Sequence, residues 1–194
     1  MDLKVVFGVL AAALALGAYA PIYYGIFFGK IRPHIYTYSV WTVTVGIAFF
    51  ASLFSAGAAG SWSLGVTTIL VGGIFFLCFK YGTKDITRSD TFALFFAAVS
   101  LVLWLLTNNP VISVILVTLI EAFSFFPTLR KTWNDPYSES YWPWIINIVK
   151  HTSIIIAVSG YSVTTVFYPA CLIVMNIILS SEIIIRRRGM REKS

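Results

Sequence analysis

Hydrophobic runs bounded by charges, glycine clusters or prolines follow one another along nearly the whole chain. Each run is about 18 to 25 residues long, the length that an α-helix needs to cross a bilayer core. An open sheet would leave its backbone groups unpaired in lipid, so the runs predict an all-α polytopic membrane protein. The seven predicted helices lie near residues 3–28, 36–56, 61–80, 91–108, 110–129, 141–159 and 163–185.

Composition argues against a soluble domain. The 194 residues are 58% hydrophobic and 11% charged, and the mean hydropathy is +0.85, which leaves too little polar surface to meet water. The formal charge of +6 is held in short clusters between apolar runs, so it indicates membrane topology and not a nucleic-acid partner. The bilayer itself is the first predicted partner.

The first run carries a pattern that also occurs at signal-peptide cleavage sites, Ala18-Tyr19-Ala20. Pro21 follows at the cleavage point, and the apolar run continues through Phe28. We therefore expect a retained first helix.

Lysines and arginines set the predicted orientation, because cytoplasmic loops carry an excess of both. Seven helices place twelve of them on one side, whereas Lys4 lies on the other and Lys150 lies inside a helix. The twelve are Lys30, Arg32, Lys80, Lys84, Arg88, Arg130, Lys131, Arg186, Arg187, Arg188, Arg191 and Lys193. This predicts a plasma (inner) membrane protein with its amino terminus outside and its carboxyl terminus in the cytoplasm.

The chain also repeats itself. The segment 32–41 aligns with 135–144, and the offset of 103 is the same for the prolines (136 − 33) and the tryptophans (144 − 41). Helix-interior prolines recur as well, at Pro21 and Pro127. The repeat predicts a three-helix unit over 1–85, a linker helix over 86–109 and a second unit with a basic cytoplasmic tail over 110–194. An odd linker makes the two units parallel repeats.

At these residues the sequence resembles the PQ-loop superfamily, which includes the SWEET and SemiSWEET sugar carriers and the KDEL receptor. The resemblance implies a 3+1+3 fold with prolines that act as hinges, here Pro21, Pro127 and Pro143. The sequence departs from the family at the Pro-Gln pair that gives the family its name, because Ile22 and Thr128 stand at the positions of the glutamine. Asn176 is near the place where SWEET carriers hold sugar hydroxyls, but its repeat mate is Gly73.

Three polar residues are costly in lipid and fall at similar depth: Glu121, Lys150 and Asn176. They are the predicted substrate-binding residues, because sites of repeat-built transporters lie near mid-membrane. Glu121 and Lys150 form either a fixed ion pair or a functional pair, and the sequence leaves both open.

Asn147 and His151 share a helical face that Lys150 flanks, and they complete the predicted site. A proton relay and an ordinary interhelical hydrogen bond are both compatible with this face. Tyr19, Tyr23, Tyr24 and Trp104 could line a cavity or serve as packing and interfacial aromatics.

The sequence thus predicts a carrier that moves a small polar solute, a sugar or another metabolite, by alternating access, with proton coupling as an open question. A non-transporting receptor or assembly protein with the same fold is the alternative. An enzyme is not predicted, because no nucleophile–base pair or metal-ligand set lies at matching depth. No cofactor and no metal are predicted, and the oligomeric state stays open.

Overall fold

The computed structural model describes residues 2–29, 33, 35–55, 58–82, 109–134, 136–137 and 141–191, together with scattered residues at 88, 91–92, 95, 98–99, 102–103 and 106. Within the helices, side chains are not described at 36, 123–124, 126–128, 130–131 and 191. The described residues contain helices and no strand, which confirms the all-α prediction. The helices are α1 (Leu3–Phe27), α2 (Ile35–Phe54), α3 (Ala59–Tyr81), α5 (Pro110–Asn134), α6 (Trp142–Ala157) and α7 (Val163–Arg191).

These helices start close to where the hydropathy pattern places them, and the differences are at two carboxyl ends. The helix α5 continues to Asn134 and α7 continues to Arg191, each five or six residues past the predicted ends at 129 and 185. The extra turn of α7 lies beyond its apolar run. It is stabilised because Arg186, Arg187 and Arg188 complement the negative end of the α7 helix dipole. The predicted helix at 91–108 lies mostly outside the described residues, and the scattered residues within it are helical.

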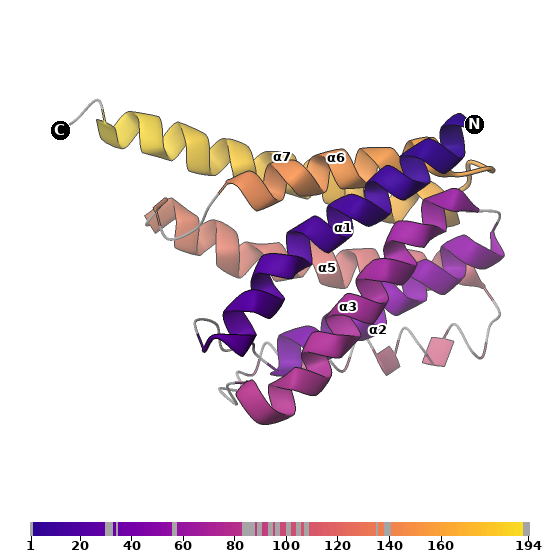
Figure 1. The fold of residues 1–194 in the computed structure, drawn as a ribbon, viewed down its shortest axis with the longest axis horizontal. Helices are drawn as coiled ribbons and strands as arrows, with labels where there is room; N and C mark the ends of the chain where they lie inside the picture. The colour runs from indigo at the N-terminus through magenta and orange to yellow at the C-terminus, as the bar shows by residue number, and fades with distance from the viewer. Residues whose placement is uncertain are drawn as a thin grey trace.

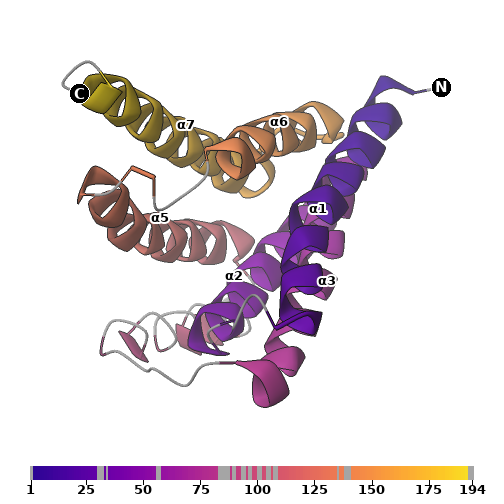
Figure 2. The same ribbon diagram turned by 60° about the vertical axis from the view of Figure 1, so that its left-hand side comes forward.

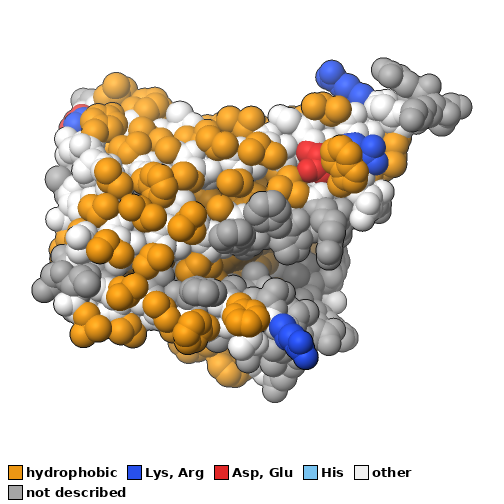
Figure 3. All heavy atoms as spheres, turned by 180° about the vertical axis from the view of Figure 1, so that it is seen from behind, with side chains coloured by type: hydrophobic (Ala, Val, Ile, Leu, Met, Phe, Trp, Pro, Cys, Tyr) orange, Lys and Arg blue, Asp and Glu red, His pale blue; other side chains and the backbone are white. Residues whose placement is uncertain are grey.

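Four described helices are long and apolar enough to cross a membrane: Leu3–Phe27, Thr37–Phe54, Ala59–Tyr81 and Val163–Met190. Large apolar side chains are exposed on these helices, Ile69, Phe76 and Phe54 among them. The face seen in Figure 3 is covered mainly by hydrophobic side chains. These are the helices of a membrane protein, because water would not tolerate so much apolar surface.

The helices group into two sets of three, with α1, α2 and α3 on one side and α5, α6 and α7 on the other (Figure 2). In the first set α3 packs on both α1 and α2, and in the second α7 packs on both α5 and α6. Across the sets, α1 packs on α6 and α2 packs on α5. The described ends of the chain lie at opposite ends of the long axis (Figure 1).

Small residues bring the helices closest near the amino terminus of α1. A Cβ added to Gly8 would lie 2.6 Å from the carbonyl oxygen of Ala59, and one added to Gly60 would lie 2.8 Å from the carbonyl oxygen of Ile154. In this region the Lys4 ammonium also donates to the carbonyl of Ser159, at 3.4 Å. Gly8 thus brings α1 against α3, and Gly60 brings α3 against the backbone of α6, so the two sets are in close contact at this end.

The prolines differ in whether their position allows them to bend their helices. Pro21 lies inside α1, and Pro127 lies within the bounds of α5, with its side chain outside the described part. Pro143 is in the first turn of α6, where a missing N–H breaks no hydrogen bond. The bending argument made from sequence therefore does not apply to Pro143. A proline that the repeat did not single out, Pro169, lies inside α7.

Candidate functional site

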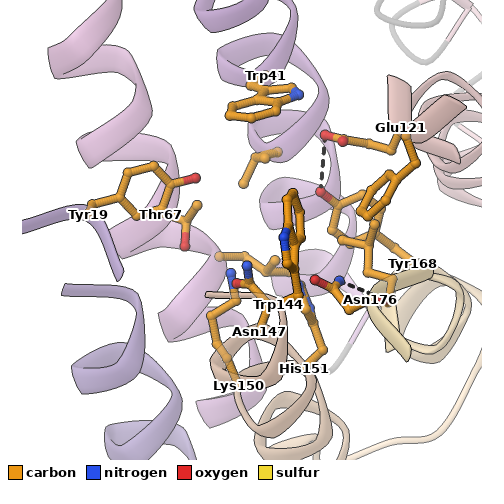
Figure 4. A pocket seen from close by; sticks show the side chains of 14 residues that line it. Tyr19, Trp41, Thr67, Glu121, Trp144, Asn147, Lys150, His151, Tyr168 and Asn176 are labelled. Carbon is orange, nitrogen blue, oxygen red and sulfur yellow. Dashed lines mark hydrogen bonds between the residues drawn. The ribbon is translucent and has the colours of Figure 1, made fainter. Parts of the chain in front are cut away.

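A cavity of about 160 Å³ lies between the two sets of helices, and every one of the six described helices contributes to its lining. The second set provides Glu121 and Phe125 from α5, four residues of α6, and Tyr168, Leu172 and Asn176 from α7. The first set provides Tyr19 from α1, Trp41 and Val45 from α2, and Leu64 and Thr67 from α3. The cavity is thus polar on several sides within an otherwise apolar bundle (Figure 4).

All five residues predicted from sequence to bind substrate line this cavity: Glu121, Asn147, Lys150, His151 and Asn176. Asn176 lies near the middle of its candidate span, Val163–Met190, as its distance from the charged end of α7 predicted. The structure therefore brings together residues that are up to 55 positions apart (176 − 121) in the sequence. Their role in binding remains a prediction.

The α6 wall is built from residues spaced three and four apart. Trp144, Asn147 and His151 are stacked on one face of the helix, and Lys150 flanks them. Only 5% of Lys150 and 3% of His151 are exposed. The Lys150 and Asn147 side chains run beside each other into the cavity toward Thr67 (Figure 4).

Glu121 enters from the other side of the cavity and is held by two hydroxyl groups. Its Oε1 accepts hydrogen bonds from Thr44 Oγ1 of α2 at 2.8 Å and from the Tyr168 hydroxyl of α7 at 3.4 Å. Since Thr44 belongs to the first set of helices and Tyr168 to the second, this carboxyl group connects the two sets. Hydrogen bonds of this kind offset part of the cost of burying a carboxylate that is 6% exposed.

Glu121 and Lys150 do not contact each other as the fixed ion pair that the sequence left open. No ion pair joins these two described side chains, which approach the cavity from opposite sides (Figure 4).

Several polar atoms on the cavity wall have no hydrogen-bond partner within the described structure. They are Thr67 Oγ1, Trp144 Nε1, His151 Nδ1 and Asn176 Oδ1. The Nδ2 group of Asn176 donates to the carbonyl of Leu172 at 2.6 Å, whereas its Oδ1 is buried without a partner among the described residues. Each buried polar atom left unpaired costs about 1–3 kcal/mol, so these four atoms retain the capacity for a further hydrogen bond.

Aromatic rings form a further part of the lining. His151 meets Tyr168 edge-on at 6.3 Å between ring centroids, and Phe125 and Trp144 are 5.8 Å apart. Trp41 and Trp144 are the two tryptophans that the internal repeat superimposes, so the repeat contained a signal for both. Thr44, Thr67 and Tyr168 had no such signal, because a hydroxyl in an apolar helix is not unusual.

Of the four aromatic residues that the sequence suggested as cavity-lining, one lies in the cavity wall. Tyr19 lines the cavity, whereas the Tyr23 hydroxyl donates to the carbonyl of Leu70 at 2.7 Å. Tyr24 is 54% exposed, and Trp104 lies outside the described residues. Among the side chains that the structure describes, no group of three or more His, Cys, Asp or Glu residues could hold a metal ion.

Comparisons of the chain with protein-family models, with curated proteins and with solved structures find no match.

Proposed function

We propose that this chain is a small-solute transporter of the PQ-loop or SWEET-like type that works by alternating access in seven membrane-spanning helices. The observation behind the proposal is the cavity between the two sets of helices, with its four unpartnered polar atoms. A packed structural core satisfies its buried polar groups internally. A cavity wall with such groups supports the binding of a polar solute there.

The pairing of the helices supports two equivalent units. Exchanging α1 with α5, α2 with α6 and α3 with α7 turns every interhelical contact described above into another one: α1–α3 becomes α5–α7, and α1–α6 becomes α5–α2. The corresponding helices start at similar offsets: 107 residues for the first pair (110 − 3) and the second (142 − 35), and 104 for the third (163 − 59). Two units related in this way can rock about a site between them.

Alternating access also needs one end of the bundle to be closed while the other opens. The close backbone contacts of Gly60 with α6, together with the bond from Lys4 to Ser159, bring the two sets together at one end. Pro21 and Pro169, each inside its helix, are places where a missing backbone hydrogen bond permits bending. Opening that end then needs the loss of a few contacts, not the unfolding of a helix.

The proposal is tested by measuring flux in vesicles reconstituted with the full chain. A panel of small sugars, amino acids and organic acids is screened for counterflow, and the solute that gives signal is then followed in Glu121→Gln and Asn176→Ala. We expect both substitutions to reduce flux at least about tenfold, since each removes a group facing the solute, and ligand hydrogen bonds to charged groups contribute about 1.5–3 kcal/mol.

Glu182→Gln is the matched control for Glu121→Gln. Glu182 also accepts from a threonine hydroxyl at 2.8 Å, that of Thr132, but it does not line the cavity. Its substitution should leave flux unchanged. Full flux in both cavity variants would refute the site. Saturable binding of a solute without flux of any solute would favour the alternative function, a non-transporting receptor with the same fold.

A further inference from the structure

Positive charge is concentrated at the carboxyl-terminal end of α7. Five of the eight residues at positions 186–193 are arginine or lysine, and one is glutamate. Arg186, Arg187 and Arg188 occupy a single turn of the helix, and like charges this close repel one another. An anionic group bound at this end of α7 would relieve that repulsion.

The contacts of Arg186 hold its side chain in place with uncharged partners. Its Nε and Nη2 donate to the carbonyl of Trp133 at 3.2 and 2.8 Å, and its guanidinium group lies over the Trp133 ring at 4.7 Å. Arg188 is exposed two residues further along the helix. The end of α7 therefore combines a fixed positive charge with an accessible guanidinium group.

Aromatic residues mark the level of these arginines relative to a membrane. Trp133 at the end of α5 is 57% exposed, and Trp142 at the start of α6 is 59% exposed. Exposed tryptophans are typical of the interface between lipid and water. Figure 3 shows Lys and Arg side chains beside a surface that hydrophobic side chains cover. The arginines of α7 thus lie at the level expected for lipid headgroups.

An exposed apolar stripe on α7, formed by Val174, Ile178 and Ile185, leads to Arg188. Arg188 follows Ile185 by three residues, so the two lie on the same face of the helix. At 1.5 Å per residue the stripe is about 17 Å long. One leaflet contributes roughly 15 Å of the hydrocarbon core. An acyl chain that lies along the stripe would therefore place its phosphate group beside Arg188.

We infer that this end of α7 binds an anionic phospholipid, with the phosphate at Arg188 and one acyl chain along the apolar stripe. A guanidinium group matches two phosphate oxygens at once. The neighbouring arginines favour a headgroup with a net negative charge, by about fivefold for each basic residue near the membrane surface. A choline headgroup has a positive charge of its own and loses this attraction. The lipid site lies outside the cavity and does not depend on the proposed transport.

The test is native mass spectrometry of the purified full chain in detergent, which resolves the first lipid bound to each molecule. The probes are phosphatidylglycerol and phosphatidylcholine with the same acyl chains. We expect the first phosphatidylglycerol to bind at least about fivefold more tightly than the first phosphatidylcholine. Equal affinities for the two lipids would overturn the inference.

Arg188→Gln removes the phosphate contact from an exposed position, where the fold does not depend on it. It should weaken phosphatidylglycerol about fivefold and leave phosphatidylcholine unchanged. Lys80→Gln is the matched control, because Lys80 is also exposed, lies in the last turn of α3 and contacts an aromatic ring. The control should bind phosphatidylglycerol as the unmodified chain does. Equal losses in the two variants would show that net charge, and not a site on α7, attracts the lipid.

Two further measurements separate a lipid from a soluble phosphate compound. Ile185→Ser should weaken both lipids, since it removes part of the surface that an acyl chain contacts. Glycerol phosphate, which has the phosphate but no acyl chain, should not displace phosphatidylglycerol at an equal concentration. Displacement by glycerol phosphate, or full lipid affinity in Ile185→Ser, would overturn the lipid assignment. Vesicle flux decides the carrier function separately, because that function depends on the cavity.

Discussion

At the scale of single residues, the hydrogen bonds around Glu121 show how the site is supported from outside the cavity. Thr44 is fully buried on α2 and donates to Glu121 on α5 at 2.8 Å, although the two are 77 residues apart (121 − 44). Thr44 does not line the cavity. It therefore acts through Glu121, as a positioning residue.

Thr44→Val keeps the shape of this side chain and removes the hydroxyl group. We expect the free energy of unfolding to fall by about 1–3 kcal/mol, because a buried carboxyl group loses a donor. Thermal unfolding of the purified chain in detergent measures the loss. Thr132→Val, which removes the equivalent donor to the half-buried Glu182, should cost less. An equal fall in the free energy of unfolding for Thr44→Val and Thr132→Val would mean that the deeper burial of Glu121 does not strengthen its hydrogen bond.

At the scale of helices, the separation between neighbours is set by glycine. Gly60 has no side chain where α3 crosses α6, and an added Cβ would lie 2.6 Å from a methyl carbon of Val158 as well as near the Ile154 carbonyl. Backbone atoms cannot move aside as a flexible side chain does. The distance between the two sets of helices therefore depends on this residue.

Gly60→Ala should destabilise the protein by about 1–3 kcal/mol, the usual cost of overpacking a close contact. The midpoint of thermal unfolding in detergent is the measurement. Gly17→Ala is the control on another helix, since an added Cβ at Gly17 meets nothing within 4 Å. It should be neutral or slightly stabilising, because alanine is the better helix former. Equal midpoints for the two variants would show that α3 and α6 are not in contact as described.

At the scale of the whole molecule, the distribution of charge agrees with the placement of the described ends. Asp2 and Gly189 lie at opposite ends of the long axis (Figure 1), and the arginines of α7 are at the same end as Gly189. Arg186 donates to the carbonyl of Trp133 at 2.8 Å and lies over the Trp133 ring at 4.7 Å. Arg187 donates to the carbonyl of Pro136 at 2.9 Å. These contacts fix the end of α7 against the end of α5.

The predicted orientation can be tested with single cysteines in a background that carries Cys78→Ala and Cys171→Ala. A maleimide that cannot cross membranes should label Asp2→Cys in intact cells and Gly189→Cys only in inverted vesicles, if the excess of lysine and arginine marks the cytoplasmic side as the sequence predicts. The background without added cysteines should remain unlabelled. Labelling of both positions from the same side would contradict an odd number of crossings.

Much of this arrangement could be predicted from the sequence because the signals are local. The bounds of α1, α2 and α3 follow from hydrophobic runs that must match the thickness of a bilayer. Glu121, Lys150 and Asn176 were found by their depth, since a helix rises by a constant 1.5 Å per residue. Asn147 and His151 were found by helical spacing. None of these inferences needed a contact between distant segments.

The sequence by itself determined that the described part of the chain is helical and which stretches form its helices, because these properties depend on each helix and its solvent alone. Only the tertiary structure decided that Glu121 is held by Thr44 and Tyr168 instead of pairing with Lys150. It also decided which polar atoms remain unpartnered on the cavity wall. Those outcomes depend on how helices rotate and approach one another, and rotation is set by packing across the whole bundle, at contacts such as Gly60 against α6.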